Sequence, residues 1–123
     1  MKKRILVIDD EAEIRELLTQ ALNHAGYEVY AAASGAEGKR RAAEKPPDLI
    51  IFDLQLEDTD GLHLIQELKQ TLPNIPVMLL TGVLFDPETI RETISRYVTV
   101  YLEKTTKLQR ILDEVRRICP NQG

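Results

Sequence analysis

Residues 4–11 read RILVIDDE, and the pattern within them repeats along the chain. The apolar part, Ile5 to Ile8, is a continuous run of branched side chains, which is typical of a strand buried on both faces of a parallel sheet. The run stops at two carboxylates, Asp9 and Asp10. A buried strand that ends in adjacent acids predicts a polar site at that end of the sheet.

Two further apolar runs also end in a polar residue, one in the carboxylate Asp53 and the other in the hydroxyl residue Thr81. The strands predicted from such runs span residues 4–8, 27–31, 48–53, 76–81 and 98–102. The stretches between them carry apolar residues three or four positions apart, which indicates amphipathic helices. These helices are expected from Glu11 to Gly26 and over residues 34–45, 61–72, 86–96 and 106–119. The alternation predicts an α/β fold, a five-stranded parallel sheet with helices on both faces.

Length and charge exclude several classes of protein. The chain has 123 residues, and we expect residues 1–123 to form a single domain, with residues 119–123 as a tail or a truncated linker. Sixteen basic against twenty acidic residues give a net charge of −4, which disfavours direct binding of nucleic acid. No apolar run approaches the roughly 20 residues of a membrane helix. With a single cysteine, Cys119, the chain is expected to be cytoplasmic.

Polar side chains follow four of the predicted strands, since Lys104 comes shortly after the last one. Because the carboxyl ends of parallel strands meet at one edge of the sheet, these side chains are expected to converge. Crowded carboxylates repel each other unless a cation is present, and Mg²⁺ prefers such oxygen ligands. A carboxylate beside a metal, a lysine and a hydroxyl is a candidate phosphoryl acceptor.

Taken in this order, the segments resemble the receiver domain of bacterial two-component response regulators over the whole chain. The matching segments are residues 5–11, residues 48–53 followed by Gly61, residues 77–82 and residues 101–104. The resemblance implies a flavodoxin-like doubly wound sheet in the order 2-1-3-4-5. It also implies a signalling switch that accepts a phosphoryl group from a sensor histidine kinase or a phosphotransfer protein, and that hydrolyses it again.

The resemblance assigns roles to individual residues. Asp53 is the implied phosphoacceptor, and Lys104 contacts the phosphate. The implied ligands of Mg²⁺ are Asp10, Asp53 and the backbone carbonyl of Gln55, with Asp9 acting through a metal-bound water. Thr81 and Tyr101 are the implied switch residues. Their movement changes the face formed by the fourth helix, the fifth strand and the fifth helix, which controls an unknown output and is also where a homodimer is expected.

Two positions depart from the family pattern, since Glu57 and Thr105 stand where prolines are usual. The proline after the lysine is commonly tied to a cis bond, which costs about 3–4 kcal/mol without proline. The Lys104–Thr105 bond is therefore either strained or trans. These departures leave an alternative open, a pseudo-receiver that signals by protein contacts without phosphorylation.

Other residues receive simpler readings. A metal-dependent phosphatase is disfavoured because no carboxylate follows closely after Asp53. Asp58 and Asp60 are interpreted as a solvated acidic loop. Tyr101 is equally interpretable as a half-buried strand aromatic. Val83 is predicted to slow hydrolysis of the phosphorylated state by shielding it from water.

Overall fold

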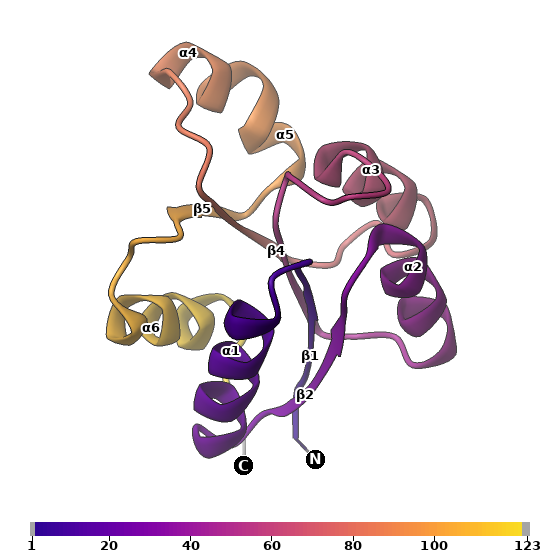
Figure 1. Ribbon diagram of the computed structural model, residues 1–123, viewed down its shortest axis with the longest axis vertical. Coiled ribbons are helices and arrows are strands. Elements are labelled where there is room, and N and C mark those ends of the chain that lie inside the picture. Colours follow the sequence, from indigo (N-terminus) through magenta and orange to yellow (C-terminus); the bar gives the residue numbers. More distant parts are fainter. Residues whose placement is uncertain (1, 122–123) are drawn as a thin grey trace.

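A computed structural model describes residues 2–121 and has a five-stranded parallel sheet at its centre (Figure 1). The strands are β1 (Arg4–Ile8), β2 (Glu28–Ala32), β3 (Leu49–Phe52), β4 (Val77–Thr81) and β5 (Val100–Glu103). They lie in the order β2-β1-β3-β4-β5, and every neighbouring pair is parallel. The predicted fold class is confirmed.

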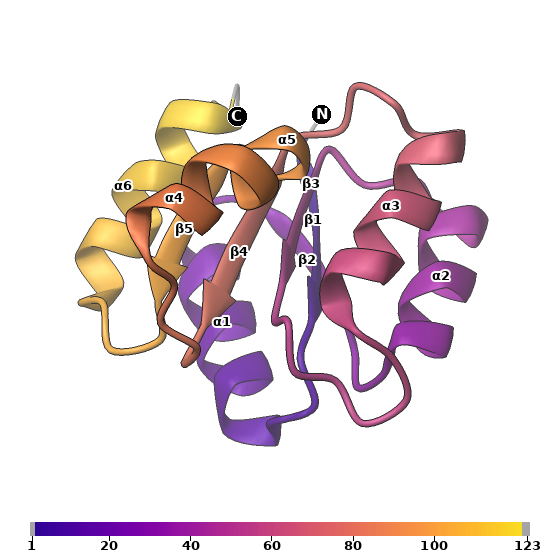
Figure 2. The same ribbon diagram turned by 90° about the horizontal axis from the view of Figure 1, so that it is seen from above.

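Helices cover both faces of this sheet, as Figure 2 shows. The regular helices are α1 (Ala12–His24), α2 (Gly35–Glu44), α3 (Gly61–Thr71) and α6 (Leu108–Ile118). Residues of β1 alternate between the two layers: Ile5 and Val7 pack with residues of α1 and α6, while Leu6 and Ile8 pack on the side of α2 and α3. All four are buried. The continuous apolar run of β1 is thus explained by burial on both faces.

One predicted helix, residues 86–96, differs in detail from the structure. It is a helical segment in three parts, α4 (Pro87–Thr89), a π-helical turn η1 (Ile90–Ile94) and α5 (Ser95–Tyr97). The predicted start is confirmed, because Asp86 Oδ1 accepts a hydrogen bond from the Thr89 N–H at 2.7 Å and Pro87 is the first helical residue. Ile94 is the buried residue of the segment. One buried residue gives too little periodicity to distinguish a π turn from an α turn.

The start and end of the α1–β2 connection are well defined. Gly26 has a φ of +102°, so the predicted glycine cap of α1 is confirmed. The Asn121 Nδ2–H donates to the Gly26 carbonyl at 2.7 Å, and the Tyr27 hydroxyl donates to the Cys119 carbonyl at 2.7 Å. The last described residues therefore lie against this turn. Residues 122 and 123 of the expected tail lie outside the described part.

The apolar spacing of α1 predicts that one face of the helix packs inward, and this expectation is wrong for one residue of that face. The predicted face consists of Ile14, Leu17, Leu18, Ala21, Leu22 and Ala25. Leu18 and Leu22 are buried as predicted, whereas Leu17 is 47% exposed. Leu17 lies beside a shallow hollow between α1 and α6. The apolar stripe of α1 is wider than the face that the sheet covers.

Gly61 begins α3 at a point where the helix touches the backbone that follows β3. A Cβ atom built on Gly61 would lie 2.2 Å from the Asp53 carbonyl oxygen and 2.8 Å from Leu54 Cα. These are backbone atoms, so relief requires the chain to shift. Glycine at this position lets α3 approach the end of β3, and thereby fixes where Asp53 stands.

We predict that Gly61→Ala lowers the free energy of unfolding by about 1–3 kcal/mol, as expected for overpacking of a tight contact. Urea denaturation of the purified protein measures this change. Gly82→Ala is the matched control, because a Cβ on Gly82 would meet nothing within 4 Å. Equal stability of the two variants would contradict the close approach at Gly61.

Candidate functional site

The structure brings the predicted strand-end residues together at one edge of the sheet. Asp9 and Asp53 directly follow β1 and β3, and Thr81 is the last residue of β4. The sheet ladder continues to both acids, because the Asp9 N–H donates to the Ala32 carbonyl and the Asp53 N–H to the Ile8 carbonyl, each at 3.1 Å. Asp9 and Asp53 are 3% exposed and Thr81 is fully buried. The ladder thus holds two acids inside the protein.

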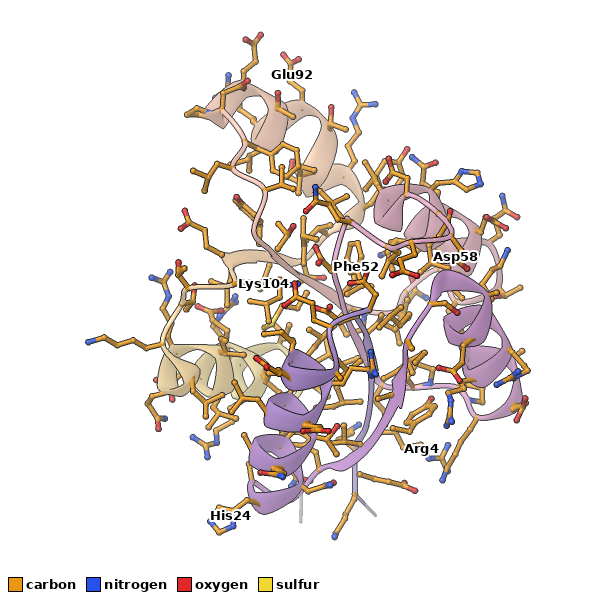
Figure 3. All side chains as sticks on the ribbon, in the orientation of Figure 1. Arg4, His24, Phe52, Asp58, Glu92 and Lys104 are labelled. Atoms are coloured by element: carbon orange, nitrogen blue, oxygen red, sulfur yellow. The ribbon has the colours of Figure 1, made fainter. Side chains whose placement is uncertain are left out.

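Lys104 is the cation that faces these acids (Figure 3). Its Nζ lies 2.7 Å from Asp53 Oδ2, 3.1 Å from Asp9 Oδ2 and 2.7 Å from Glu11 Oε1. Its backbone N–H donates to the Thr81 carbonyl at 2.9 Å, which fixes the start of the side chain at the end of β4. The lysine therefore reaches across the sheet edge from β5 to the ends of β1 and β3.

Burial and charge act in opposite directions on these groups. Burial alone lowers the pKa of Lys104, but its hydrogen bonds to Asp53 and Glu11 and the charge of Asp9 outweigh this, so the pKa is raised and the ammonium is charged. Burial raises the pKa of Asp9, and the hydrogen bonds from Glu11 and Lys104 offset this only in part. Ionising Asp9 therefore costs more in the folded protein than in the unfolded chain.

The acids form a set that fits a hard divalent cation. Asp9, Asp10, Glu11 and Asp53 each offer a carboxylate oxygen, and these atoms lie within 4.8 Å of one another. Oxygen ligands of this kind suit Mg²⁺, and a dication would balance the negative charge that one lysine leaves over. Gln55 is held nearby, since its N–H donates to Asp53 Oδ1 at 3.3 Å.

Two residues that were not predicted from the sequence, Glu11 and Arg15, also contact the site. Glu11 pairs with Lys104, and the signal for it was the third acid in the run after β1. The Arg15 guanidinium donates to the Asp9 carbonyl at 2.7 Å and so holds the turn between β1 and α1. The spacing of Arg15 within α1 gave no sign of this contact.

Thr81 and Tyr101 both hydrogen-bond to the backbone of one residue, Val83. The Val83 N–H donates to Thr81 Oγ1 at 3.2 Å, and the Tyr101 hydroxyl donates to the Val83 carbonyl at 2.9 Å. The half-buried Tyr101 ring also meets Phe85 edge-on, with ring centroids 5.9 Å apart. A change at Thr81 would therefore reach Tyr101 through the backbone of Val83.

Asp58 and Asp60 are exposed loop residues, as interpreted from the sequence, but each also caps a helix. Asp60 Oδ1 accepts from the Leu62 N–H at 2.8 Å and caps α3. Asp58 accepts from the Gly35 and Ala36 N–H groups at 2.8 and 2.9 Å and caps α2. Both acids are exposed, but each satisfies the backbone of a helix N-terminus, which sequence alone assigns only when the cap is adjacent.

The two departures from the family's prolines have simple structural outcomes. Glu57 lies exposed in the loop between β3 and α3. All peptide bonds of residues 2–121 are trans, including the bond between Lys104 and Thr105. Of the two alternatives for that bond, the structure has the trans form.

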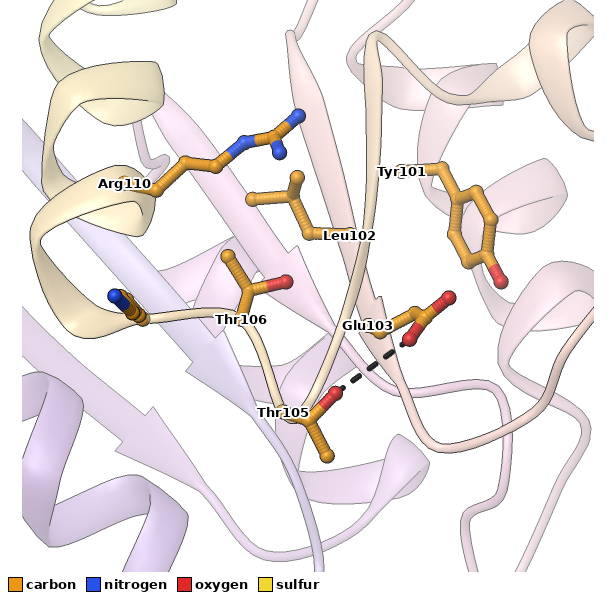
Figure 4. A pocket seen from close by; sticks show the side chains of 7 residues that line it. Tyr101, Leu102, Glu103, Thr105, Thr106 and Arg110 are labelled. Carbon is orange, nitrogen blue, oxygen red and sulfur yellow. Dashed lines mark hydrogen bonds between the residues drawn. The ribbon is translucent and has the colours of Figure 1, made fainter.

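A groove runs beside β5 and the start of α6 (Figure 4), with a volume of about 480 Å³. The residues that line it are Tyr101, Leu102, Glu103, Thr105, Thr106, Lys107 and Arg110. Thr105 Oγ1 lies 3.5 Å from Glu103 Oε2 within it. No residue of the acid cluster lines the groove, whereas Tyr101 does.

Among the described helices, none has the length and apolar character needed to cross a membrane.

We predict that Asp9→Asn raises the free energy of unfolding at neutral pH when divalent cations are chelated. The pKa of Asp9 is raised above 3.8, so the folded state binds this proton more tightly than the unfolded chain. The wild type therefore loses stability as the pH rises above 3.8, and the variant lacks this loss. Urea denaturation in EDTA from pH 4 to pH 7 measures it.

Asp113→Asn, which removes an exposed acid from α6, controls for net charge. If the Asp9 variant were no more stable at neutral pH than this control, the proposed cost of ionising the buried Asp9 would be contradicted.

Comparison with known proteins agrees with this geometry. The family model of the response regulator receiver domain matches residues 5–116. The chain is 40% identical over 82 residues to the alkaline phosphatase synthesis transcriptional regulatory protein PhoP of Bacillus subtilis, covering 67% of this chain and 34% of PhoP. It is 36% identical over 119 residues to the response regulator protein VraR of Staphylococcus aureus, covering 95% of this chain and 56% of VraR. The chain thus spans about a third to just over half of these two relatives.

Solved structures resemble the whole chain. The chemotaxis response regulator CheY4 of Vibrio cholerae superposes with a TM-score of 0.87 at 27% identity, covering 96% of this chain and 99% of CheY4. The response regulator TrrA of Thermotoga maritima, solved in complex with Mg²⁺ and BeF, superposes with a TM-score of 0.83 at 30% identity, covering 96% and 99%. Since sequence and structure agree along nearly all of its length, the chain belongs to the response regulator receiver domain family, the signalling domain of two-component systems.

Proposed function

We propose that this domain is a phosphorylation-dependent switch in which Asp53 accepts a phosphoryl group from a phosphohistidine of a sensor histidine kinase or phosphotransfer protein. The observation that carries the proposal is the position of Asp53, a buried carboxylate 2.7 Å from Lys104 within a cluster of carboxylate oxygens. Membership of the receiver family supports the same role. So does the Mg²⁺ and BeF complex of TrrA, a similar structure.

In the proposed transfer, an oxygen of Asp53 attacks phosphorus, the new O–P bond forms and the N–P bond of phosphohistidine breaks, leaving the imidazole. Asp10, Asp53 and the backbone carbonyl of Gln55 would hold Mg²⁺, with Asp9 acting through a water. When bound, the ion neutralises charge on the phosphoryl oxygens and on the acids. Lys104 would donate to a phosphoryl oxygen and so exchange one anionic partner for another.

The conformational response would start at Thr81. Its hydroxyl accepts from the Val83 N–H, and turning toward a phosphoryl oxygen would give up this hydrogen bond. The Val83 carbonyl accepts from the Tyr101 hydroxyl, so a shift of the Val83 backbone would move Tyr101 as well. The affected surface is the face of α4, η1, α5, β5 and α6, including the groove beside Tyr101. We propose this face as the contact for the output partner and for a homodimer.

Hydrolysis of the phosphorylated aspartate is part of the proposal. Val83 places an apolar, partly buried side chain two residues after Thr81. This side chain would hinder the approach of an attacking water, and we predict that it slows hydrolysis of the phosphorylated Asp53.

A pseudo-receiver that signals without phosphorylation is the second candidate. Glu57 and Thr105, which replace the usual prolines, favour it. The complete set of acids with Thr81 and Lys104 argues for the first candidate. A phosphorylation assay separates the two.

We predict that Asp53→Asn abolishes phosphoryl incorporation from acetyl phosphate in the presence of Mg²⁺, because an amide oxygen is too poor a nucleophile. Intact-protein mass spectrometry measures the incorporation. Asp113→Asn, the exposed variant of α6, should label like the wild type. Equal labelling of the Asp53 variant would refute the acceptor, and no labelling of any protein would favour the pseudo-receiver.

We predict that Lys104→Ala retains Mg²⁺ binding but loses the conformational response, since its ammonium contacts anions and ligates no cation. The readout is the NMR shift of residues around Tyr101 on adding Mg²⁺ with beryllofluoride. Lys107→Ala removes an exposed lysine nearby and should respond like the wild type. A full response in the Lys104 variant would contradict its role.

A further inference from the structure

The loop between β3 and α3, residues 54–60, begins directly after Asp53 and contains Gln55. Its base is closed by backbone contacts: Gln55 and Asp60 form an antiparallel bridge, and the Gly61 N–H donates to the Leu54 carbonyl at 2.8 Å. The Gln55 N–H also donates to Asp53. The base of the loop therefore moves with the acid cluster, and what holds the tip of the loop also affects Gln55.

The tip is held by Asp58 against a different part of the chain. Asp58 Oδ1 accepts from the Gly35 N–H at 2.8 Å and Oδ2 from the Ala36 N–H at 2.9 Å. These hydrogen bonds lower the pKa of Asp58. The two oxygens thus grip successive peptide groups at the start of α2, and Figure 3 shows Asp58 beside that helix.

Gly35 permits this contact. A Cβ atom on Gly35 would lie 2.4 Å from Thr59 Cγ2 and 3.3 Å from Asp58 Oδ1. The loop therefore rests directly on the backbone of the helix start. A side chain at residue 35 would push the loop tip away.

Helix α2 also has caps of its own. Ser34 Oγ accepts from the Glu37 N–H at 3.1 Å, and Glu37 Oε1 accepts from the Ala33 N–H at 2.6 Å. This arrangement is a variant of the capping box, because Glu37 accepts from the residue before the N-cap and not from Ser34 itself. Asp58 accepts from two further N–H groups of the helix start, those of Gly35 and Ala36. The contact serves α2 as a second cap. It also joins the β3–α3 loop, which begins next to Asp53, to the N-terminus of α2.

We propose that Asp58 is a positioning residue that clamps the β3–α3 loop onto α2 and thereby sets the affinity of the site for Mg²⁺. The inference rests on the proposed function, because the clamp acts through the backbone of Gln55, an implied metal ligand. The clamp also restrains the loop that carries Glu57, where a proline would otherwise limit the backbone. Asp58 itself touches neither the metal nor the phosphoryl group.

The test is Asp58→Ala, which removes both acceptors. We expect the Mg²⁺ affinity of the unphosphorylated protein to fall about tenfold, the lower end of the effect of outer-shell partners. Isothermal titration with MgCl₂ measures it. Asp58→Asn keeps one acceptor oxygen and should recover part of the affinity. Amide hydrogen exchange of residues 54–60 should be faster in the alanine variant.

Ser34→Ala is the matched control, because it weakens the cap of α2 without touching the loop. It should lower stability and leave Mg²⁺ affinity unchanged. The positioning role of Asp58 would be overturned if Ser34→Ala lowered the Mg²⁺ affinity as much as Asp58→Ala does. It would also be overturned if Asp58→Ala bound Mg²⁺ with the affinity of the wild type.

Failure of the clamp and failure of the proposed function give different results. A wild type that bound no Mg²⁺ would overturn the proposed function and the metal role of Asp58 with it. Unchanged exchange of residues 54–60 in Asp58→Ala would overturn the clamp alone, whatever the affinity of the wild type for Mg²⁺.

Discussion

The rest of the structure depends on one interaction, the pairing of Lys104 with two buried carboxylates. Asp9 and Asp53 are almost fully enclosed, and an unpaired buried charge is strongly destabilising. Because β1 and β3 are neighbours in the sheet, their ends place the two acids together, and β5 carries the lysine past β4 to reach them. One ammonium among several acids leaves residual negative charge at this edge. This charge is the physical reason for proposing that the edge binds a cation and that one of its carboxylates acts as a nucleophile toward phosphorus.

Two backbone connections link the site to its surroundings. On one side, the backbone N–H and carbonyl of Val83 join Thr81 to Tyr101 and so to the surface around β5. On the other side, Asp58 joins the loop after Asp53 to α2. The first connection contains the buried Thr81 hydroxyl, which accepts a hydrogen bond that it would give up in the proposed switch. The second consists of charge-assisted hydrogen bonds to a helix start and suits a fixed support. In the proposed function, the loop side supports the site and the Val83 side responds.

The sequence predicted those features that depend on local pattern. The apolar runs ending in Asp9, Asp53 and Thr81 predicted the strands and their meeting at one edge, because strand burial and parallel pairing follow from composition. The strand order came from resemblance, since spacing alone does not set it. The features that were not predicted include the contact of Glu11 with Lys104, the cap of Asp58 on α2 and the π turn in residues 90–94. The first two are contacts between segments distant in sequence, and the third lies in a segment with little burial.

We propose that Asp53, at the acidic edge of the sheet, accepts a phosphoryl group only when Mg²⁺ is bound. The decisive measurement is the intact mass of the wild-type protein after incubation with a small phosphodonor, once with Mg²⁺ and once with EDTA. We expect a single phosphoryl adduct with Mg²⁺ and essentially none with EDTA. An adduct that forms equally well in EDTA, or no adduct in either condition, would contradict it.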